Sequence, residues 1–477
     1  MTAKSGHAKA TLVKNTVILA VGKFSSQLIT FLMLPLYTAF LSPSEYGIVD
    51  VVITYVALLA PAITIQMEMA VFRFLIEARE NEIEKTRIIS NSLQIVLAML
   101  LLFFPGAIVV QSFVNVPYIW IILGIIAMAV FSGLCLQIAR GLGKNFNYAI
   151  ASIVIGVMTA VSNFVLIVYL EMGASGLLLS MLLAYSVSTV YLVLSLRLYR
   201  YVSFGVSDKG LRKKLLKYAA PLVPNSIAWW VINAADRTII LLVLGLAANG
   251  IYAIASKFPL IYTAVFAVFG LSWTESASVH INDKDRGKFF SDTFDAAFRF
   301  FGSIGLGIIA SLPFVFPILV NERYEEAYVY IPVMILGALF NSIVGLYGAV
   351  YVAKKMTGKV ATTSIMAAAI SISINLLFIN FIGLFSAAVA NAVAFLSMAI
   401  YRHYDLKKYV TISYRKSLIF KLAFLYSTVI VSYYLDYFYL NIATIASVII
   451  IAYILNRGAV GFLKTRLSSR FRSSTNM

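Results

Sequence analysis

The chain has 477 residues, of which 61% are apolar and only 12% are charged, and its formal net charge is +18. A mean hydropathy of +0.91 excludes a water-soluble domain of this size. Unbroken apolar runs of about twenty residues suit helices that cross a hydrocarbon core of about 30 Å, whereas membrane strands would alternate over about ten residues. The sequence therefore predicts an all-α polytopic membrane protein.

The chain opens with a basic tail and two long apolar segments. The first segment is too long for a cleavable signal peptide and lacks an Ala-x-Ala exit, so we expect a retained span. Lys23 lies within this segment, and Asp50 and Glu68 lie within the second one, which starts near residue 45. A charge at the bilayer centre costs about 2.5–3.5 kcal/mol, so these side chains are predicted to face a protein interior or a water-filled cavity.

Further apolar segments bring the total to about 14 predicted spans. They lie near residues 88–113, 116–139, 148–170, 174–196, 219–244, 251–277, 289–319, 328–352, 360–382, 384–401, 417–435 and 440–455. The longest polar stretch of the middle, near 197–218, divides the chain. We therefore expect a six-helix lobe at 1–198, a basic linker at 199–217, a second six-helix lobe at 218–401, and two extra helices with a basic tail at 402–477.

The distribution of basic residues predicts the orientation of the spans. Most of the 38 Lys and Arg residues fall in the two tails and in every second connection, whereas the opposite connections contain only Arg323. By the positive-inside rule both termini are expected to be cytoplasmic. Attraction to anionic lipid explains the net charge, and a nucleic-acid partner is not expected, since no polar domain displays a basic groove.

An internal repeat relates the two predicted lobes. LSPSEYGI at 41–48 and LGLAANGI at 244–251 both join two spans, and they lie 203 residues apart, an offset of six spans. An even offset makes the repeats parallel, so the first two spans of each lobe are predicted to line a central cleft.

The four helices that this repeat places around the cleft contain the polar stripes. Adjacent helical residues point about 100° apart, so Asp236 and Arg237 cannot pair well with each other and each should meet a partner on a neighbouring helix. Net positive charge near the middle of the membrane would suit a phosphate or diphosphate group. The predicted substrate-binding residues are Lys23, Gln27, Arg237, Lys257 and Asn233, and the predicted ion-coupling or charge-pair residues are Asp50, Glu68 and Asp236.

The sequence lacks the residues that metal sites, cysteine chemistry or nucleotide binding would need. Cysteine occurs once, at Cys135, and the three histidines are scattered, so disulfides, zinc sites and Cys/His nucleophiles are not supported. The fingerprint GxxxxGK[ST] of ATP-binding loops is absent, so neither a nucleotide nor another cofactor is expected. Energy should then come from an ion gradient, the membrane potential or the substrate gradient.

Several segments resemble a known family. They are LPLYTAFLSPSEYGIVDV, MEMAVFRFLIEARE, LQIARGLGKNFNYA, and P-x-x-P-N-S with A-D-R and G-x-Y in the seventh and eighth spans. These resemble the polysaccharide-type (Wzx, O-antigen) flippases of the multidrug/oligosaccharidyl-lipid/polysaccharide (MOP) exporter superfamily, which also includes the MATE-type transporters.

This resemblance implies a bacterial inner-membrane protein that is not an enzyme and that moves undecaprenyl-pyrophosphate-linked oligosaccharides to the outer leaflet by alternating access. Its implied partners are that substrate, membrane lipids and other polysaccharide-assembly proteins. A cationic lumen is a family trait, and Lys23 and Arg237 lie on the helices that supply it. The first helix here offers a single lysine, which departs from that pattern.

Three alternatives stay open. A drug or cation antiporter of the same superfamily would need an acidic lumen. A membrane polysaccharide polymerase or glycosyltransferase would need substantial outer loops, whereas the longest one here, near 321–326, could not bury an active site. A lipid II flippase would have an arginine-rich first helix, which this chain lacks.

Overall fold

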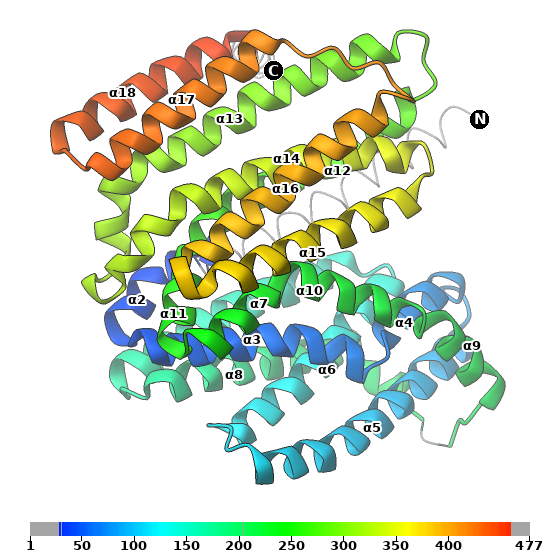
Figure 1. Ribbon diagram of the computed structural model, residues 1–477. Helices are drawn as coiled ribbons and strands as arrows, with labels where there is room; N and C mark the ends of the chain where they lie inside the picture. Colours follow the sequence, from blue (N-terminus) through cyan, green and yellow to red (C-terminus); the bar gives the residue numbers. More distant parts are fainter. Residues whose placement is uncertain (1–27, 30, 204, 459–477) are drawn as a thin grey trace, which may run out of the picture. The chain divides into compact units, whose positions relative to one another are not determined.

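The computed structural model describes residues 28–458 apart from 30 and 204, and every regular element in this part is a helix (Figure 1). Twelve helices among the described residues are long and apolar enough to cross a membrane. Helix α10 (Leu222–Val243) adds a further 22-residue helix. Of the first predicted span, most lies outside the described residues, and α2 (Leu34–Phe40) forms its end. The all-α polytopic fold agrees with the sequence.

Contacts divide the chain into two compact units, Met1–Ala253 and Ile254–Met477. The first contains α2, α3 (Pro43–Ile63), α4 (Met67–Glu77), α5 (Glu82–Phe113), α6 (Ile119–Gly141), α7 (Asn145–Asn163) with its π-helical extension η1 (Phe164–Tyr169), α8 (Gly173–Ser195), η2 (Leu198–Tyr201), α9 (Lys209–Ala219), α10 and most of α11 (Leu246–Ala255). The lobe boundaries predicted above follow the sequence repeat rather than contacts, and they stay a prediction.

The start of α3 is encoded locally. Ser42 caps the helix, because its hydroxyl accepts a hydrogen bond from the Glu45 N–H while the Glu45 carboxylate accepts one from the Ser42 N–H at 2.9 Å. Pro43 occupies the first helical position, where its missing N–H would have no partner in any case. The segment Ser42–Glu45 thus fixes where the second span begins.

The apolar pattern predicted one continuous helix for the second span, but the structure divides it into two helices. The helix breaks between α3 and α4, where Ile65 and Gln66 adopt left-handed backbone angles, with φ of 51° and 57°. Pro61, inside the last turn of α3, lacks the N–H that would continue the hydrogen-bond ladder. The amide of Gln66 donates to Ser226 Oγ on α10 at 2.5 Å, so the break is tied to a neighbouring helix.

The predicted eighth span is likewise interrupted. Helix α11 ends at Ala255 and α12 starts at Lys257, with a turn at Ser256 between them. Pro259 has no N–H to donate back to Ala255, which weakens the ladder at this point. The predicted eighth span is therefore two helices, and Lys257 begins the second of them.

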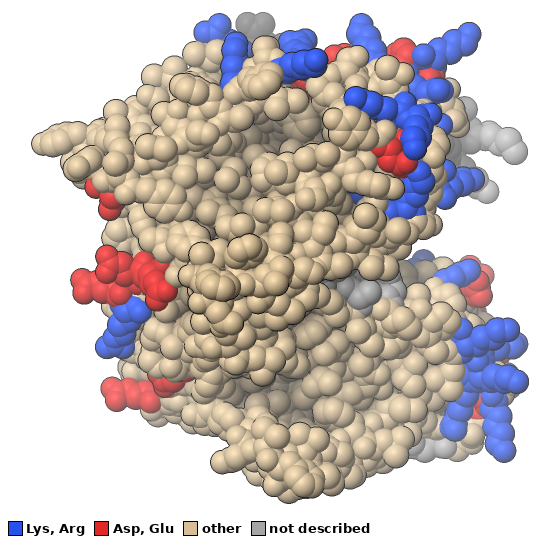
Figure 2. Space-filling view, viewed as in Figure 1, with Lys and Arg blue, Asp and Glu red and all other residues tan. Residues whose placement is uncertain are grey.

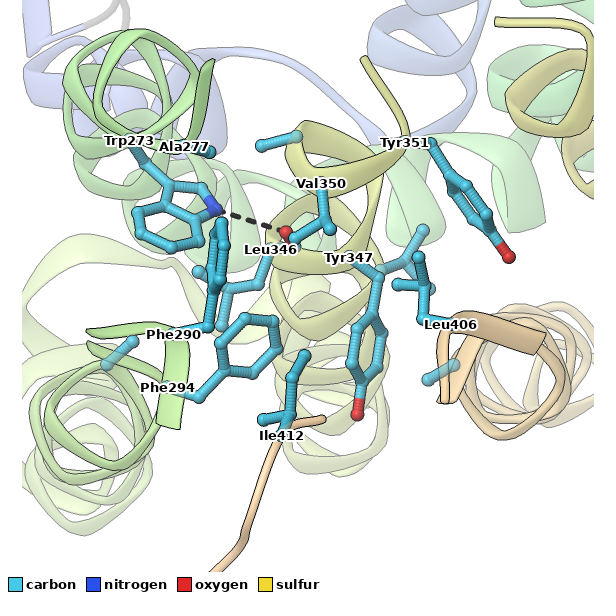
Figure 3. Close-up of a cluster of buried hydrophobic side chains, with 14 of the residues drawn as sticks. Trp273, Ala277, Phe290, Phe294, Leu346, Tyr347, Val350, Tyr351, Leu406 and Ile412 are labelled. Atoms are coloured by element: carbon cyan, nitrogen blue, oxygen red, sulfur yellow. Dashed lines mark hydrogen bonds between the residues drawn. The ribbon is translucent and has the colours of Figure 1, made fainter. Parts of the chain in front are cut away.

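The second unit contains the remaining helices: α12 (Lys257–His280), α13 (Arg286–Leu319), η3 (Glu322–Tyr330), α14 (Ile331–Ala353), α15 (Thr357–Ile382), α16 (Phe385–Leu406), α17 (Lys416–Leu435) and α18 (Phe438–Leu455). Its core is rich in aromatic side chains from α12, α13 and α14 (Figure 3). Trp273 is 3% exposed and donates its indole N–H to the Leu346 carbonyl at 3.0 Å, so its single polar group is satisfied inside the apolar cluster.

Segments that the charge pattern assigned to one side of the membrane lie together. In the first unit, Arg79 donates to the Gly141 carbonyl at 2.7 Å, which joins the 78–81 and 141–144 connections. In the second unit, Arg415 lies 2.9 Å from Asp295, and Lys359 lies 2.6 Å from Asp405. In each unit Lys and Arg gather at one end of the helices, and the surface between the ends is largely uncharged (Figure 2).

Candidate functional site

The candidate site lies along the contact between α3 and α10 in the first unit. The indole N–H of Trp230 donates to the Thr54 carbonyl at 2.7 Å, and the hydroxyls of Tyr55 and Thr238 are 3.3 Å apart. Tyr55 and Trp230 also pack ring against ring, with centroids 5.6 Å apart. The two helices run in opposite directions, and polar contacts join them along their length.

An ion pair stands near one end of this contact. Arg237 Nε lies 2.8 Å from Asp50 Oδ2, and the exposed fractions of the two side chains are 22% and 7%. The amide of Asn249, at the start of α11, donates to the same carboxylate oxygen and to the Gly47 carbonyl, both at 3.3 Å. The carboxylate charge of Asp50 is therefore balanced by a guanidinium and supported by an amide.

The neighbouring acid, Asp236, has a different partner. Its side chain is 5% exposed, and Tyr252 on α11 donates its hydroxyl to Asp236 Oδ2 at 3.2 Å. The Arg237 guanidinium lies over the ring of Tyr252, 5.9 Å from its centroid. The prediction that Asp236 and Arg237 would find separate partners on neighbouring helices is confirmed.

Two glycines let α11 reach Asp50. A Cβ atom added at Gly47 would overlap the Leu246 carbonyl oxygen, and one added at Gly250 would overlap the Pro43 carbonyl oxygen. No other residue would permit the two helix starts to approach so closely without a shift of the backbone. This approach brings Asn249 within reach of the ion pair.

Of the remaining predicted residues, Glu68 and Lys257 have side chains that the structure describes. Glu68, on α4, accepts a hydrogen bond from the Thr64 hydroxyl at 2.6 Å. Lys257 is the first residue of α12 and is half-buried in the second unit. Asn233 lies on α10, with its side chain outside the description, and Lys23 and Gln27 lie outside the described residues.

Asn249 and Tyr252 are members of the cluster that polar periodicity did not single out. Both lie in α11, a ten-residue helix too short to reveal a polar stripe. The internal repeat could have identified these two residues. They lie in the segment GLAANG and the motif G-x-Y, which occupy the connection that matches SPSEYG in the first repeat. With Asp50 and Asp236 as carboxylates and Arg237 as the cation, the described cluster can exchange an ion-pair partner or bind a proton or cation.

Comparison with known proteins supplies the family. The profile of the polysaccharide biosynthesis protein family matches residues 12–274, more than half of the chain. Among proteins of curated function, none matches the sequence.

Solved structures share the fold at low sequence identity. A lipid II flippase, MurJ, in an inward closed conformation has a TM-score of 0.68 at 15% identity, and the match covers 93% of this chain and 100% of that one. An inward-facing multidrug resistance MATE family transporter of the MOP superfamily has a TM-score of 0.64 at 13% identity, covering 80% and 95%. A MOP superfamily transporter from Pyrococcus furiosus, described as having a binding pocket of reverse polarity, has a TM-score of 0.54 at 13% identity, covering 83% and 96%.

The helices thus define a polytopic membrane protein whose fold is shared with the MATE transporter and the lipid II flippase described above. The family match is more specific than the fold. The chain belongs to the polysaccharide biosynthesis protein family.

Proposed function

We propose that the protein is a flippase that moves a diphosphate-linked polyprenyl oligosaccharide from the cytoplasmic to the outer leaflet of a bacterial inner membrane by alternating access. The family match supports a role in polysaccharide assembly, and the shared fold with a lipid II flippase supports a lipid-linked substrate. The protein acts as a transporter, with no chemical step on the sugar.

The Arg237–Asp50 pair is the observation that carries this proposal. A guanidinium binds a diphosphate through paired N–H donors as readily as a carboxylate, so a substrate diphosphate can replace Asp50 as the partner of Arg237. Because the pair joins α3 to α10, such an exchange separates the two helices at this end. Substrate binding would thereby be linked to opening, as alternating access requires.

The other polar residues have supporting roles in the proposal. Lys23, Gln27, Asn233 and Lys257 contribute further contacts to the diphosphate and the first sugar. Asp236 and Glu68, with Asp50 once Arg237 has left it, bind the coupling proton or cation. The substrate, membrane lipids and the proteins that polymerise the sugar are the expected partners.

A second function is favoured by the charges of the cluster itself. Asp50 and Asp236 are both buried carboxylates, and each accepts a hydrogen bond within the cluster. An acidic site suits a drug or cation antiporter, the class to which the MATE neighbours belong. The two functions differ in the sign of the charge that they transport.

Reconstitution into vesicles separates the two functions. The flippase proposal predicts that labelled undecaprenyl-diphosphate oligosaccharide crosses the bilayer, and that the K23A and R237A variants lose most of this flux while still inserting. The R73Q variant is the matched control, because Arg73 forms an exposed pair with Glu77 on α4. Normal flux in the K23A/R237A double variant would refute the proposed site, and export of a cationic dye on an imposed sodium or proton gradient would establish the antiporter instead.

A further inference from the structure

An apolar groove lies in the second unit, apart from the α3–α10 contact. Its volume is about 580 Å³, within the range of roughly 300–1,000 Å³ that is typical of small-molecule sites. Helices α14, α16 and α17 form its walls, and α13 contributes Phe298. The large side chains Ile400, Tyr404 and Ile419 along it are 49%, 62% and 45% exposed, so the groove opens to the outer surface of the helix bundle.

The groove is about one leaflet deep. Along α17 its lining extends from Ile419 to Ile430, and along α14 from Tyr347 to Leu336. Eleven residues of helix rise about 16 Å, which is close to half of the hydrocarbon thickness of about 30 Å. A chain that enters from one membrane surface would therefore reach the bilayer middle and stop there.

One end of the groove is polar and the other is apolar. Tyr347, whose ring borders the aromatic core in Figure 3, has its hydroxyl 3.0 Å from that of Tyr414 and 3.4 Å from His403 Nδ1. Tyr404 completes this end, whereas Leu336 and Ile430 lie at the other. Tyrosine with its hydroxyl at the boundary and its ring in the apolar phase is typical of the level of lipid headgroups.

Basic side chains surround the polar end. Lys407 Nζ lies over the ring of Tyr404, 5.0 Å from its centroid. Lys416 begins α17, three residues before Ile419, and is exposed. Within the described part of the chain, no carboxylate lies within ion-pair distance of Lys407 or Lys416. Their positive charge is available to an anionic headgroup, and each basic residue near a membrane surface contributes about 1 kcal/mol to that attraction.

We infer that this groove binds one anionic glycerophospholipid, with an acyl chain along α17 and its phosphate beside Lys407 and Lys416. A groove with apolar walls throughout would accept any lipid, and the basic end makes the site selective for anionic headgroups. A long polyprenyl chain would extend beyond a groove that ends at mid-membrane. The site thus differs from the proposed transport site, and it does not depend on which substrate the protein moves.

Only one side of α17 lines the groove, so substitutions on that side and on an adjacent side of the helix form a matched pair of variants. Ser427 lines the groove, and Thr428, the next residue, points about 100° away from it; both are exposed. The S427W variant should block the acyl chain, and T428W should not. For the headgroup, the K407Q/K416Q variant is matched by K284Q/K288Q, which removes one exposed lysine from the connection between α12 and α13 and one from the first turn of α13.

Native mass spectrometry of the full chain, titrated with phosphatidylglycerol or phosphatidylethanolamine, tests the inference. We expect one phosphatidylglycerol to bind at least about tenfold more tightly than phosphatidylethanolamine, since two lysines contribute. S427W should abolish this binding, K407Q/K416Q should remove the preference, and both controls should retain it. Equal binding of the two lipids, unchanged binding in S427W, or displacement of phosphatidylglycerol from the wild type by an equal concentration of undecaprenyl phosphate would overturn it.

Discussion

Gly47 and Gly250 contact each other's helix starts reciprocally. Gly47 lies against the carbonyl of Leu246, and Gly250 lies against the carbonyl of Pro43. Gly47 and Gly250 are 203 residues apart in the sequence, as are Pro43 and Leu246 and the two stretches of the internal repeat. The repeat makes Gly47 equivalent to Gly250 and Pro43 equivalent to Leu246, so each glycine contacts the equivalent of the residue that its counterpart contacts. A two-fold relation between the two stretches produces such reciprocal contacts. The repeat seen in the sequence thus has a physical counterpart at the ion-pair end of α3.

A methyl group at either glycine should disturb this crossing. For G47A and G250A we expect a loss of about 1–3 kcal/mol in the free energy of unfolding, the usual cost of overpacking. The effects should not add in the double variant, because one shift of the helix starts relieves both overlaps. Thermal unfolding in detergent measures this. The control is G133A in α6, where an added Cβ meets nothing within 4 Å; a loss as large in G133A would contradict the packing argument.

Neutralising one partner of the Asp50–Arg237 pair should lower the free energy of unfolding more than neutralising both partners. D50N leaves a guanidinium without its anion, and loss of one partner of a buried pair costs about 3–5 kcal/mol. The D50N/R237Q double variant should regain part of that stability, because no charge is then left alone. Thermal unfolding of the two single variants and the double variant gives the coupling energy.

The exposed Arg73–Glu77 pair provides the comparison for this cycle. Its side chains are 48% and 65% exposed, and such a pair contributes at most about 1 kcal/mol. E77Q should therefore unfold almost as the wild type does. A coupling energy between Asp50 and Arg237 no larger than that between Arg73 and Glu77 would show that the buried pair has no special role.

The break between α3 and α4 stores backbone strain at Ile65. For a β-branched residue, a φ of 51° costs roughly 1–2 kcal/mol of conformational free energy, and glycine avoids this cost. I65G should thus unfold at a temperature equal to or higher than that of the wild type, despite the lost side chain. A62G, three residues earlier in regular helix, should be less stable by about 1 kcal/mol. Equal losses in both variants would mean that Ile65 is not strained.

The segment before α9 should respond to acid through Asp208. The Leu211 N–H donates to its carboxylate at 3.0 Å and lowers its pKa, and the Asp208 N–H donates to Asn91 on α5 at 3.0 Å. A lowered pKa in the folded state means that the carboxylate stabilises the fold above the ordinary Asp pKa of about 3.9, and that this contribution is lost as the pH falls through the folded value. A spin label at exposed Lys213 should become more mobile below about pH 4.

Two variants check the assignment to Asp208. D208N should remain ordered from neutral pH to acid and should lose the transition, because asparagine caps a helix about as well as aspartate but does not titrate. D283N, in the exposed connection after α12, should behave as the wild type does. An unchanged transition in D208N would assign it to another group.

Arg402 should not tolerate lysine. Its side chain is 2% exposed and donates to the Val344 carbonyl at 2.9 Å and to Thr363 Oγ1 at 2.7 Å, which joins α14, α15 and α16. An ammonium cannot reproduce the planar fork, so R402K should lose about 1–3 kcal/mol for each acceptor left unsatisfied. R299K is the control, since among the described residues the Arg299 side chain donates to the carbonyl of Asp295, one turn earlier in its own helix, and to no other helix. Equal unfolding temperatures for R402K and the wild type would contradict this role.

The sequence alone determined the features that depend on composition and local spacing. The spans follow from apolar runs of bilayer length, because a helix in lipid must satisfy its own backbone groups. The connections that gather at one end of each unit follow from the Lys and Arg pattern. Likewise, helix geometry sufficed to show that Asp236 and Arg237 need separate partners, since adjacent side chains diverge by about 100°.

Only the tertiary structure decided which partners these were. Periodicity assigns a residue to a face of its own helix, but it carries no information on which other helix that face meets. Asp50 meets Arg237 because Gly47 and Gly250 permit a close crossing, and Asn249 and Tyr252 join them from a helix too short to show a stripe. The sequence also did not predict the left-handed break at Ile65 and Gln66, because an apolar run predicts a continuous helix. The hydrogen bond from Gln66 to Ser226 on α10, which stabilises the break, is a tertiary contact.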